Sequence, residues 1–399
     1  MFEELREEAG NLGQPEWQPM LQYVVDLHAR SVHPVQAPLR RPWEEIGPGY
    51  HLAPAFGHWD LVHQILDVLP AEPEHTRAQI LNNLDNQEDD GLVPGSIWMA
   101  GDQPRWSREF GHPPLWPVAI EDYCAATRDR SLIADCFDAL ARQIGWFERE
   151  RKAEGIGFYY TDILNHKWES GIDEGVRFDD VATGAWACVD ATAHVYLLYE
   201  HAARWAAELG READSFSAKA SELKSFMQDE LFDEETGLFH DIWAVGRPEV
   251  RHLAFEGMWP FVVGAAAPEH AARVIDENLL NPQRFFTAHP IATVAVSDPA
   301  FELRMWRGPA WNSMTYWAAR GCLRYEREDA ARRLLEAALD AAAAQFERTG
   351  TVWEFYHPLG GNLEDLTRKP QTKQNRPCRD YLGHNPLLAM ARMWEEASE

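Results

Sequence analysis

The sequence is organised around the stretch HKWESGIDEGVRFDD, residues 166–180. It holds five carboxylates and a tryptophan, and its Gly-Ile-Asp-Glu-Gly core fits neither a helical nor a strand period. Glycines let a backbone turn sharply or pass close to another group, so these residues predict a loop rich in acidic groups. Taken alone, such a loop is either a solvated acidic turn or part of a functional site, and the rest of the chain decides between the two.

Amphipathic helices are expected on both sides of this loop. Apolar residues recur at helical spacing over residues 21–29, 59–69, 74–87, 115–127, 131–151, 185–209, 212–230, 253–263, 268–278, 309–325, 328–348 and 385–396. Strand signals are few, the clearest being a short hairpin over residues 231–239 with Glu-Thr-Gly at its turn. Paired helices predict an all-α fold, either a solenoid or a closed toroid. Functional-looking residues gather in alternate loops, which favours a closed (α/α)6 toroid that brings those loops together around a cleft.

Composition narrows the function classes. The chain has 399 residues without a linker or low-complexity tract, so we expect one domain over residues 1–399. A net charge of -27 argues against nucleic acid and against an anionic membrane as partners, since both require a basic surface. The few lysines reflect either genome composition or a salt-adapted surface. Tryptophan is abundant, with 17 residues, and its flat ring with an N–H group is typical of carbohydrate clefts.

The cysteines and the first residues indicate a cytoplasmic protein. The cysteines are scattered and odd in number, which predicts reduced, buried thiols rather than disulfides or metal ligands. Residues 1–6 are acidic and do not resemble a signal peptide. No metal-ligand spacing stands out, so we expect no metal and no cofactor, and a solvated turn over residues 88–90 is favoured over a calcium site. The sequence leaves a homo-oligomer open.

Three further stretches share the composition of the acidic loop. Trp59 and Asp60 stand at the start of a helix, where Asp60 is either a first-turn acid or a site residue. Residues 305–312, MWRGPAWN, place an arginine between tryptophans, ahead of a proline where a helix begins. Residues 351–358, TVWEFYHP, place Glu354 in a short extended segment between bulky aromatic residues.

Carboxyl groups among aromatic rings suit the cleavage of glycosidic bonds. Such a carboxyl loses solvation, which raises its pKa. One protonated carboxyl and one ionised carboxylate are what this reaction needs: the first protonates the leaving oxygen, and the second activates water or attacks the sugar. Tryptophans stack on the apolar faces of the pyranose ring, and arginine and amide groups bind its hydroxyls. We therefore expect a small carbohydrate as substrate.

Five elements, which follow the family's order along the chain, resemble the signatures of glycoside hydrolase family 63 and of mannosylglycerate hydrolase-like enzymes. WESGID at residues 168–173, followed by RFD at 177–179, is similar to W-E-S-G-x-D-N-S-P-R-W-D. WRGPAW at 306–311 and EFYHP at 354–358 resemble W-R-G-P-x-W and E-x-Y-x-P. WD at 59–60 and the segment from 87 to 94 match W-D and Q-x-x-D-G-x-x-P. The resemblance covers most of the chain.

The resemblance implies an (α/α)6 toroid that hydrolyses a small α-glycoside with inversion: an α-glucoside, an α-mannoside, trehalose or a glycosylglycerate. It implies Asp173 as general acid, with Trp168 as its apolar wall, and Glu354 as general base, and an inverting pair lies about 6.5–9.5 Å apart. The substrate-binding residues that it implies are Trp59, Asp60, Gln87, Asp90, Trp168, Glu169, Gly171, Arg177, Trp306, Arg307, Gly308, Trp311, Tyr356 and His357.

The chain departs from the family pattern at two places. Glu174 replaces an asparagine, Gly175-Val176 replaces Ser-Pro, and Phe178 replaces a tryptophan, while Asp179 is expected to orient Arg177. The segment 368–379 is the basic cluster of an acidic chain. It is either a solvated loop packed on acidic neighbours or a recognition element for an anionic or unusual aglycone.

Two other functions remain as alternatives. N-acylglucosamine 2-epimerase-type isomerases also use an (α/α)6 toroid and rely on facing histidines, for which this chain offers His252, His289, His357 and His384. A non-catalytic carbohydrate-binding protein would keep the cleft without the chemistry. The presence of both Asp173 and Glu354 argues against it.

Overall fold

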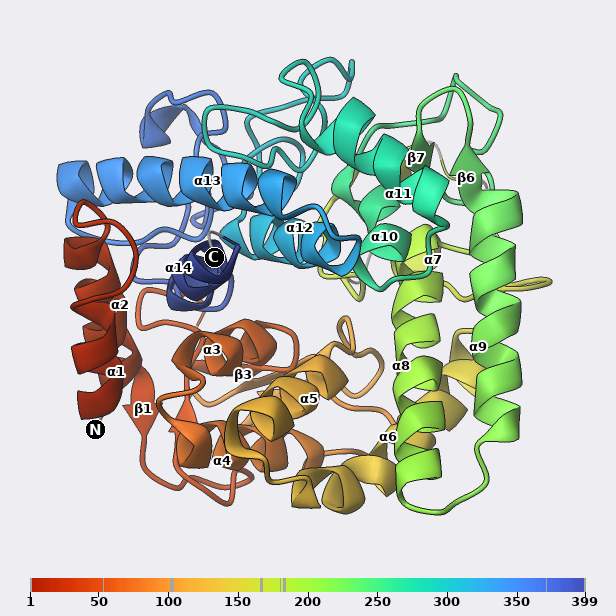
Figure 1. Ribbon diagram of the computed structural model, residues 1–399, viewed down its shortest axis with the longest axis horizontal. Helices are drawn as coiled ribbons and strands as arrows, with labels where there is room; N and C mark the ends of the chain where they lie inside the picture. Colours follow the sequence, from red (N-terminus) through yellow and green to blue (C-terminus); the bar gives the residue numbers. More distant parts are fainter. Residues whose placement is uncertain are drawn as a thin grey trace.

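Two concentric rings of helices form the protein (Figure 1). The computed structural model describes residues 2–52, 54–100, 104–165, 168–179, 181, 184–370 and 372–397, without the side chains of residues 105 and 106. The inner ring consists of α3 (Asp60–Val68), α5 (Trp116–Thr127), α8 (Val189–Glu208), α10 (Trp259–Val262), α12 (Asn312–Arg324) and α14 (Leu387–Glu396). The chain alternates between this ring and an outer one, and this alternation is the (α/α)6 toroid that the sequence predicts.

The outer ring consists of α2 (Gln18–Ser31), α4 (Pro73–Leu84), α6 (Ser131–Glu150), α9 (Asp214–Phe226), α11 (Pro268–Arg273) and α13 (Glu328–Thr349). A π-helical turn extends α9 over Met227–Leu231, and another extends α11 over Val274–Leu279. The short helix α1 (Glu3–Ala9) packs on α2. The amphipathic stripes that predict these helices face inward, since the apolar residues of α6 and α13 are buried while their acidic residues face the solvent.

The inner ring closes through side-chain packing. Helix α14 packs on α3 and on α12, so the last helix joins the first helix of the ring. Between α5 and α8, the rings of Trp116 and Trp205 lie 6.1 Å apart, and the indole N–H of Trp205 donates to Glu121 at 2.6 Å. Buried apolar residues of both rings form one continuous hydrophobic core.

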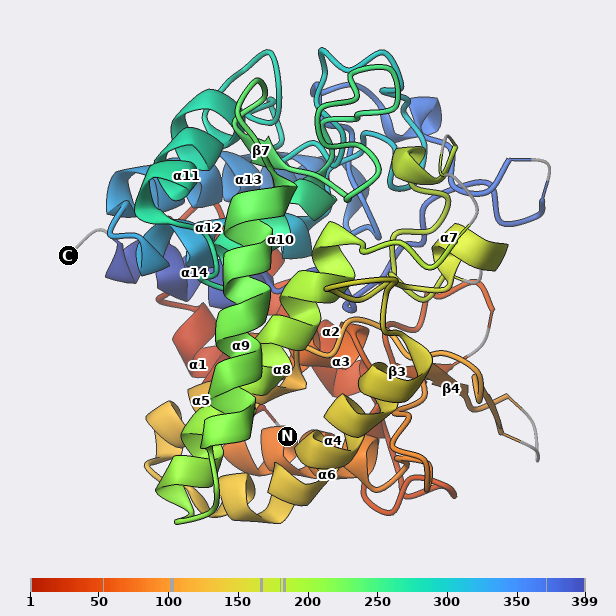
Figure 2. The ribbon, with the colours of Figure 1, turned by 90° about the vertical axis from the view of Figure 1, so that its right-hand side faces the viewer.

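The connections that carry the predicted motifs lie at one end of the rings (Figure 2). Here are the short strands β3 (Ala55–Gly57), β4 (Ser96–Trp98) and β5 (Arg105–Trp106), which form an antiparallel sheet in the order β3-β4-β5, and the short helix α7 (Asp162–Asn165). The remaining strands are two small antiparallel pairs, β1 (Val32–His33) with β2 (Trp43–Glu44) and β6 (Phe232–Asp233) with β7 (Leu238–Phe239). The pair β6–β7 is the predicted hairpin. In the part of the chain that is described, no helix has the length and apolar character needed to cross a membrane.

One helix begins later than the sequence indicates. Pro309 predicts a first turn, yet α12 begins at Asn312. Ala310 instead pairs in extended conformation with Tyr356, through reciprocal hydrogen bonds of 3.0 and 2.9 Å. This pairing draws the segment that contains Glu354 against the segment that contains Trp311.

Candidate active site

A pocket of about 80 Å³ lies at the end of the rings where α3 and α12 begin. Residues from several loops far apart in sequence line it: Ile46, Tyr50, Trp59, Asp60, Ser96, His112, Gly171, Asp173, Met305, Trp306, Trp311, Glu354, Arg368, Tyr381 and His384. The pocket thus brings together both predicted catalytic carboxyls and five of the predicted substrate-binding residues, which are Trp59, Asp60, Gly171, Trp306 and Trp311.

A stack of indole rings forms one wall of the pocket. The rings of Trp306 and Trp311 are 3.6 Å apart and nearly parallel, and Trp59 continues the stack at 5.8 Å from Trp306. Gly171 has a φ of +73°, and a Cβ atom at this position would lie 2.2 Å from the ring of Trp59. Glycine is therefore required where the acidic loop passes over this wall. The indole N–H of Trp59 is buried without a partner among the described residues, which leaves it available to a ligand.

Glu354 is held in the pocket by two donors. Its carboxylate accepts hydrogen bonds from Nε of Arg368 at 2.9 and 2.7 Å and from the backbone N–H of Cys378 at 3.0 Å. Only 1% of the residue is exposed. Hydrogen bonds from a guanidinium suit a carboxylate anion and fix its orientation. Such an anion is what a general base must be.

Asp173 lies in the turn of the acidic loop and contacts Lys369, whose Nζ is 3.1 Å from its Oδ2. Burial raises the pKa of Asp173, Lys369 and Arg368 lower it, and the charge of Glu354 raises it, with a net increase. A carboxyl with a raised pKa retains its proton at higher pH, which suits a proton donor. Trp168, predicted as the wall beside Asp173, has its ring 4.8 Å from Nζ of Lys369 and is 47% exposed.

Asp60 is a third carboxyl in the same pocket. Tyr381 donates its hydroxyl to Oδ1 of Asp60 at 2.8 Å, and burial raises the pKa of Asp60 to about 7. A Cβ atom on Gly383 would lie 2.1 Å from the same oxygen, so the backbone packs directly against this carboxyl. Asp60 is the first residue of α3, so the first-turn interpretation and the site interpretation both apply to it.

Several predicted binding residues lie outside the pocket and support the surrounding loops. Glu169 is buried and accepts hydrogen bonds from Arg151, Thr161 and Gly111 at 2.7, 2.8 and 3.3 Å. The amide N–H groups of Gln87 donate to the carbonyls of Gly91 and Ala139. The carboxylate of Asp90 accepts the N–H of Leu92 within the same turn.

Tyr356 and His357, which follow Glu354, and Arg307 and Gly308, which follow Trp306, also lie outside the lining of the pocket. The hydroxyl of Tyr356 donates to Asn385 at 3.2 Å, and His357 lines a separate small cavity. Gly308 packs against the backbone of Glu302: a Cβ atom at position 308 would lie 2.4 Å from the carbonyl oxygen of Glu302. Arg307 pairs with Asp179 at 2.6 Å. The expectation that Asp179 orients Arg177 is therefore wrong, because Asp179 binds Arg307 instead.

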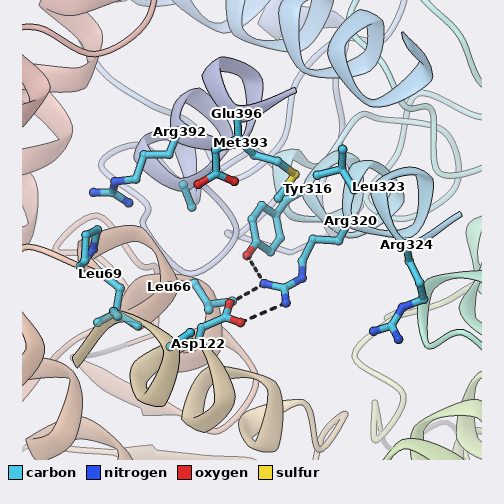
Figure 3. Close-up of a pocket in the computed structure, with 14 residues that line it drawn as sticks. Leu66, Leu69, Asp122, Tyr316, Arg320, Leu323, Arg324, Arg392, Met393 and Glu396 are labelled. Atoms are coloured by element: carbon cyan, nitrogen blue, oxygen red, sulfur yellow. Dashed lines mark hydrogen bonds and ion pairs between the residues drawn. The ribbon is translucent and has the colours of Figure 1, made fainter. Parts of the chain in front are cut away.

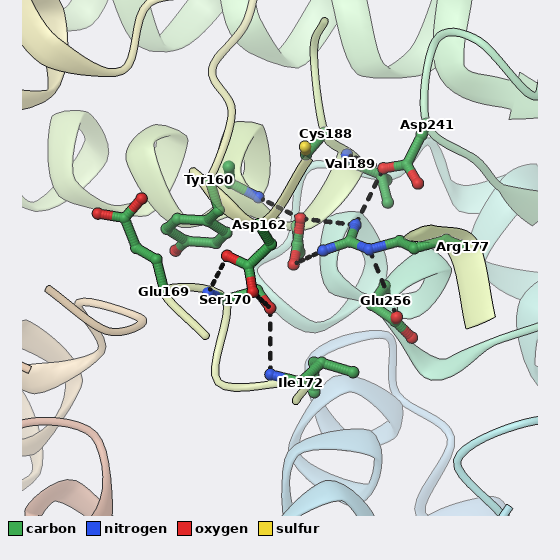
Figure 4. Close-up of polar contacts among 12 residues, drawn as sticks. Tyr160, Asp162, Glu169, Ser170, Ile172, Arg177, Cys188, Val189, Asp241 and Glu256 are labelled. Atoms are coloured by element: carbon green, nitrogen blue, oxygen red, sulfur yellow. Dashed lines mark hydrogen bonds and ion pairs between the residues drawn. The ribbon is translucent and has the colours of Figure 1, made fainter. Parts of the chain in front are cut away.

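Arg177 occupies a buried charge cluster beside the acidic loop (Figure 4). Its guanidinium lies 2.6 Å from Asp190, 3.0 Å from Asp241 and 3.5 Å from Glu256. Burial raises the pKa of Asp241 to about 6 and that of Glu256 to about 7. Cys188, Asp190 and Asp241 are close enough together to hold a metal ion, but the guanidinium already bonds both of these aspartates. We therefore infer that this cluster has a structural role and holds the acidic loop in place.

A larger cavity, of about 680 Å³, lies at the opposite end of the ring, between the C-terminal turns of α3, α12 and α14 (Figure 3). Its Arg320 bonds Asp122 and the hydroxyl of Tyr316. None of the predicted site residues lines it. The size of a cavity therefore does not locate the chemistry in this molecule.

The pocket contains residues that the motifs do not indicate. Tyr50, His112, Arg368, Tyr381 and His384 line it. The unusual composition of the basic segment 368–379 is the signal for Arg368, while Tyr50 and His112 stand in stretches without a recognisable pattern. Arg368 and His112 each carry a buried nitrogen without a partner in the described ranges.

The four histidines of the isomerase alternative do not face one another across the pocket. Only His384 lines it, and burial holds the pKa of this residue well below its ordinary value. His252 lines a cavity beside Arg177, and His289 and His357 line another. A pair of histidines for proton exchange on a free sugar is therefore not assembled from these four.

Comparisons with known proteins identify the family of this chain. A family model for the mannosylglycerate hydrolase MGH1-like glycoside hydrolase domain matches residues 53–375. A mannosylglycerate hydrolase of Rubrobacter radiotolerans is 23% identical over 400 residues, which cover 79% of this chain and 88% of that protein.

Solved structures show the same fold. The GH63 mannosylglycerate hydrolase from Thermus thermophilus, in complex with glucose, superposes with a TM-score of 0.71 at 18% identity, over 96% of this chain and 100% of that one. The neutral trehalase of Saccharomyces cerevisiae gives a TM-score of 0.67 at 14% identity, over 92% of this chain and 76% of that one. The family model covers most of the chain, so the protein belongs to the mannosylglycerate hydrolase MGH1-like glycoside hydrolase family and is a glycoside hydrolase.

Proposed function

We propose that the protein hydrolyses a small α-linked glycoside with inversion at the anomeric carbon. The observation that carries this proposal is the shared pocket of Asp173 and Glu354, walled by Trp59, Trp306 and Trp311. Two carboxyls in different environments can divide the roles of acid and base, because burial favours the proton on Asp173 while Arg368 holds the carboxylate of Glu354.

In the proposed reaction, the sugar ring lies on the tryptophan stack. Asp173 donates its proton to the glycosidic oxygen as the bond from this oxygen to the anomeric carbon breaks. Glu354 accepts a proton from the water that attacks the anomeric carbon on the opposite face. Asp60 and the indole N–H of Trp59 are placed to bind hydroxyls of the same ring. The distance between the two catalytic carboxyls is expected to be about 6.5–9.5 Å, the separation typical of inverting enzymes.

The small pocket favours a short substrate over a polysaccharide. Relatives named mannosylglycerate hydrolase and a trehalase fold neighbour support glycosylglycerates, trehalose, α-glucosides and α-mannosides as the compounds to test. All five cysteines are buried and free, which supports the reducing, cytoplasmic setting that we expect.

Proton NMR during hydrolysis of this panel tests the proposal. A β-anomer is expected to appear first and then to mutarotate. Asp173→Asn and Glu354→Gln should each abolish this signal, while Glu364→Gln, which changes an exposed glutamate near the basic segment, should not. Circular dichroism of each variant checks its folding. Initial release of an α-anomer would exclude inversion, and full activity in both pocket variants would refute the catalytic assignment.

A further inference from the structure

Lys369 contacts the proposed proton donor at the mouth of the pocket. Its ammonium lies 3.1 Å from the carboxylate of Asp173 and 4.8 Å from the ring centre of Trp168. The side chains of Lys369 and Asp173 are 22% and 17% exposed, whereas that of Glu354 is 2% exposed. The Asp173 side of the pocket therefore faces the solvent, and Lys369 stands on that side.

The backbone fixes the position of Lys369. Its N–H donates to the carbonyl of Gln374 at 3.1 Å, and the N–H of Arg368 donates to that of Asn375 at 3.0 Å. The preceding Thr367 accepts a hydrogen bond from Met305 at 2.9 Å. Consecutive residues of the basic segment thus contact the two proposed catalytic carboxyls. Arg368 contacts the proposed base, Glu354, and Lys369 contacts the proposed acid, Asp173. The start of the segment therefore lies in the pocket, paired with acidic neighbours, whereas its residues 372, 373, 375 and 376 are exposed.

The contact between Lys369 and Asp173 opposes catalysis as it stands. A general acid must carry a proton before it reacts, and a neutral carboxyl no longer attracts an ammonium ion. The other charged groups around Asp173 are fixed parts of the pocket: Arg368 favours its anion, and Glu354 and Asp60 favour its neutral form. Tyr50 carries no charge at ordinary pH, because burial raises its pKa. Burial keeps His112 and His384 neutral at ordinary pH.

The leaving group must lie where Lys369 stands. The general acid protonates the oxygen that links the sugar to the leaving group, so the leaving group lies against Asp173. Any group next to that oxygen is within reach of an ammonium that touches the same carboxyl. An ammonium carries three donors, so it can pair with a second anion at this place.

We propose that Lys369 receives a negatively charged group on the leaving part of the substrate, and that this exchange of partners releases Asp173 to take up the proton that it donates. This inference rests on the proposed function. The anion of the substrate pairs with the ammonium, Asp173 takes a proton from the solvent, and that proton passes to the glycosidic oxygen as the bond to carbon breaks. Anion binding and proton uptake by Asp173 then reinforce each other, since coupling between two sites is reciprocal.

A matched pair of substrates tests the recognition step. An α-glycosylglycerate and the corresponding α-glycosylglycerol differ only in a carboxylate that replaces a hydroxymethyl group. We expect kcat/KM of the wild type to favour the glycerate by about tenfold, the effect of one partly buried ion pair. Lys369→Met should remove this preference, and Lys369→Arg should retain it. Lys373→Met, which removes an exposed lysine of the same segment, is the control and should retain it as well.

The pH profile tests the release step. Without Lys369 the anion of Asp173 loses its ammonium, so its pKa rises and the acid stays protonated to higher pH. Lys369→Met should therefore move the alkaline limb of kcat/KM for the neutral glycosylglycerol to higher pH, and Lys373→Met should leave the limb in place. The proposal is overturned if Lys369→Met keeps the wild-type preference for the glycerate. It is also overturned if the alkaline limb of kcat/KM stays at the same pH in Lys369→Met.

A binding measurement separates this inference from the proposed function. Calorimetric titration with D-glycerate, in two buffers of different ionisation enthalpy, measures proton uptake on binding. We expect net uptake by the wild type, loss of uptake in Asp173→Asn, and about tenfold weaker binding by Lys369→Met. Glycerate binding that takes up no proton, or that is equally tight in Lys369→Met, would overturn the inference. Proton-linked binding without hydrolysis of any glycoside would refute the proposed function alone.

Discussion

The pocket and the Arg177 cluster each place three carboxyls beside basic side chains, yet the two are built differently. In the cluster, Arg177 comes from the acidic loop itself and bonds Asp190 directly, and the remaining space is about 20 Å³. In the pocket, Arg368 and Lys369 come from a separate loop near the C-terminus, and about 80 Å³ remains open.

This difference separates support from chemistry. A cation that fills the space between its carboxylates fixes them and excludes a ligand. A cation that reaches the pocket from a separate loop, beside open space, can exchange its partner for a ligand. Composition alone does not distinguish the two cases, since both offer acidic residues beside an arginine.

Asp173→Asn should produce the largest effect, and the effect should be on rate. Loss of the general acid is expected to lower kcat by roughly 10²–10⁴-fold. The free energy of unfolding should change by less than about 1 kcal/mol, because the partner ammonium of Lys369 lies at the mouth of the pocket, where water can solvate it. Steady-state kinetics and urea unfolding measure the two quantities. If Asp173→Asn instead lowers the free energy of unfolding strongly, Asp173 supports the fold as the Arg177 cluster does.

Arg177→Met should show the opposite pattern. It leaves three buried carboxyls without their cation, so the free energy of unfolding should fall by about 3–5 kcal/mol. Arg177→Lys keeps the charge but loses the two-pronged contact with Asp190, and we expect a smaller loss. Chemical denaturation followed by tryptophan fluorescence measures both. If Arg177→Met unfolds at the wild-type urea concentration, the cluster does not support the fold.

Buried acids and buried histidines shift stability in opposite directions as the pH rises from about 5. Burial lowers the pKa of His58 and His289 to about 4 and that of His384 well below its ordinary value, so their stabilising contribution grows until the pH reaches about 6.5. Above about pH 7 these histidines are neutral in both states, and stability should fall towards pH 9.

The pKa values of Asp241, Glu256 and Asp60 are raised to about 6, 7 and 7. A group whose pKa is higher in the folded state than in the unfolded state stabilises the fold at pH values below its unfolded-state pKa. This contribution is lost as the pH rises through its folded-state pKa. The pKa of His28, about 9, acts in the same direction, since its stabilisation is present below 6.5 and is lost towards 9.

Thermal unfolding at several pH values measures this pH dependence. Asp241→Asn removes one carboxyl with a raised pKa, so its melting temperature should rise relative to that of the wild type as the pH increases from 5 to 7. Glu44, whose pKa is lowered to about 2, limits stability only at acidic pH, as it becomes protonated from 4.5 downward. A difference in melting temperature between Asp241→Asn and the wild type that stays constant from pH 5 to 7 would contradict the assignment of a proton to Asp241.

Asp179→Asn should have the smallest effect. Asp179 pairs with Arg307, but its side chain is 54% exposed and Arg307 keeps Glu302 as a second partner at 3.0 Å. A solvated pair of this kind contributes less than about 1 kcal/mol to stability. The loss in urea unfolding should therefore be well below that of Arg177→Met. If Asp179→Asn and Arg177→Met lose the same free energy of unfolding, the exposure of an ion pair does not determine how much it stabilises this protein.

Much of the fold follows from local sequence. The periodicity over 131–151 and 328–348 predicts α6 and α13 to within a residue, because an amphipathic stripe is a local property. The start of α12 could not be predicted this way. Pairing with Tyr356, a residue far along the chain, overrides the local preference of Pro309 for a first helical turn.

The candidate site follows from sequence only in part. Trp59, Asp173, Trp306 and Glu354 belong to predicted motifs, and the pocket brings them together. Spacing does not tell in which direction a side chain points. The same motifs therefore include Arg177 and Gln87, although these two side chains contact other partners. The contact of Lys369 with Asp173 joins two distant loops through closure of the ring, and no local pattern encodes it.

The stacked indoles of Trp306 and Trp311 have a spectroscopic consequence. Two rings 3.6 Å apart and inclined by only 6° form an excitonically coupled chromophore within the pocket wall. A sugar that stacks on this wall changes the environment of the pair, so circular dichroism and ultraviolet absorbance can report occupancy without a label. The protein thus carries a built-in optical probe for ligands that are never turned over.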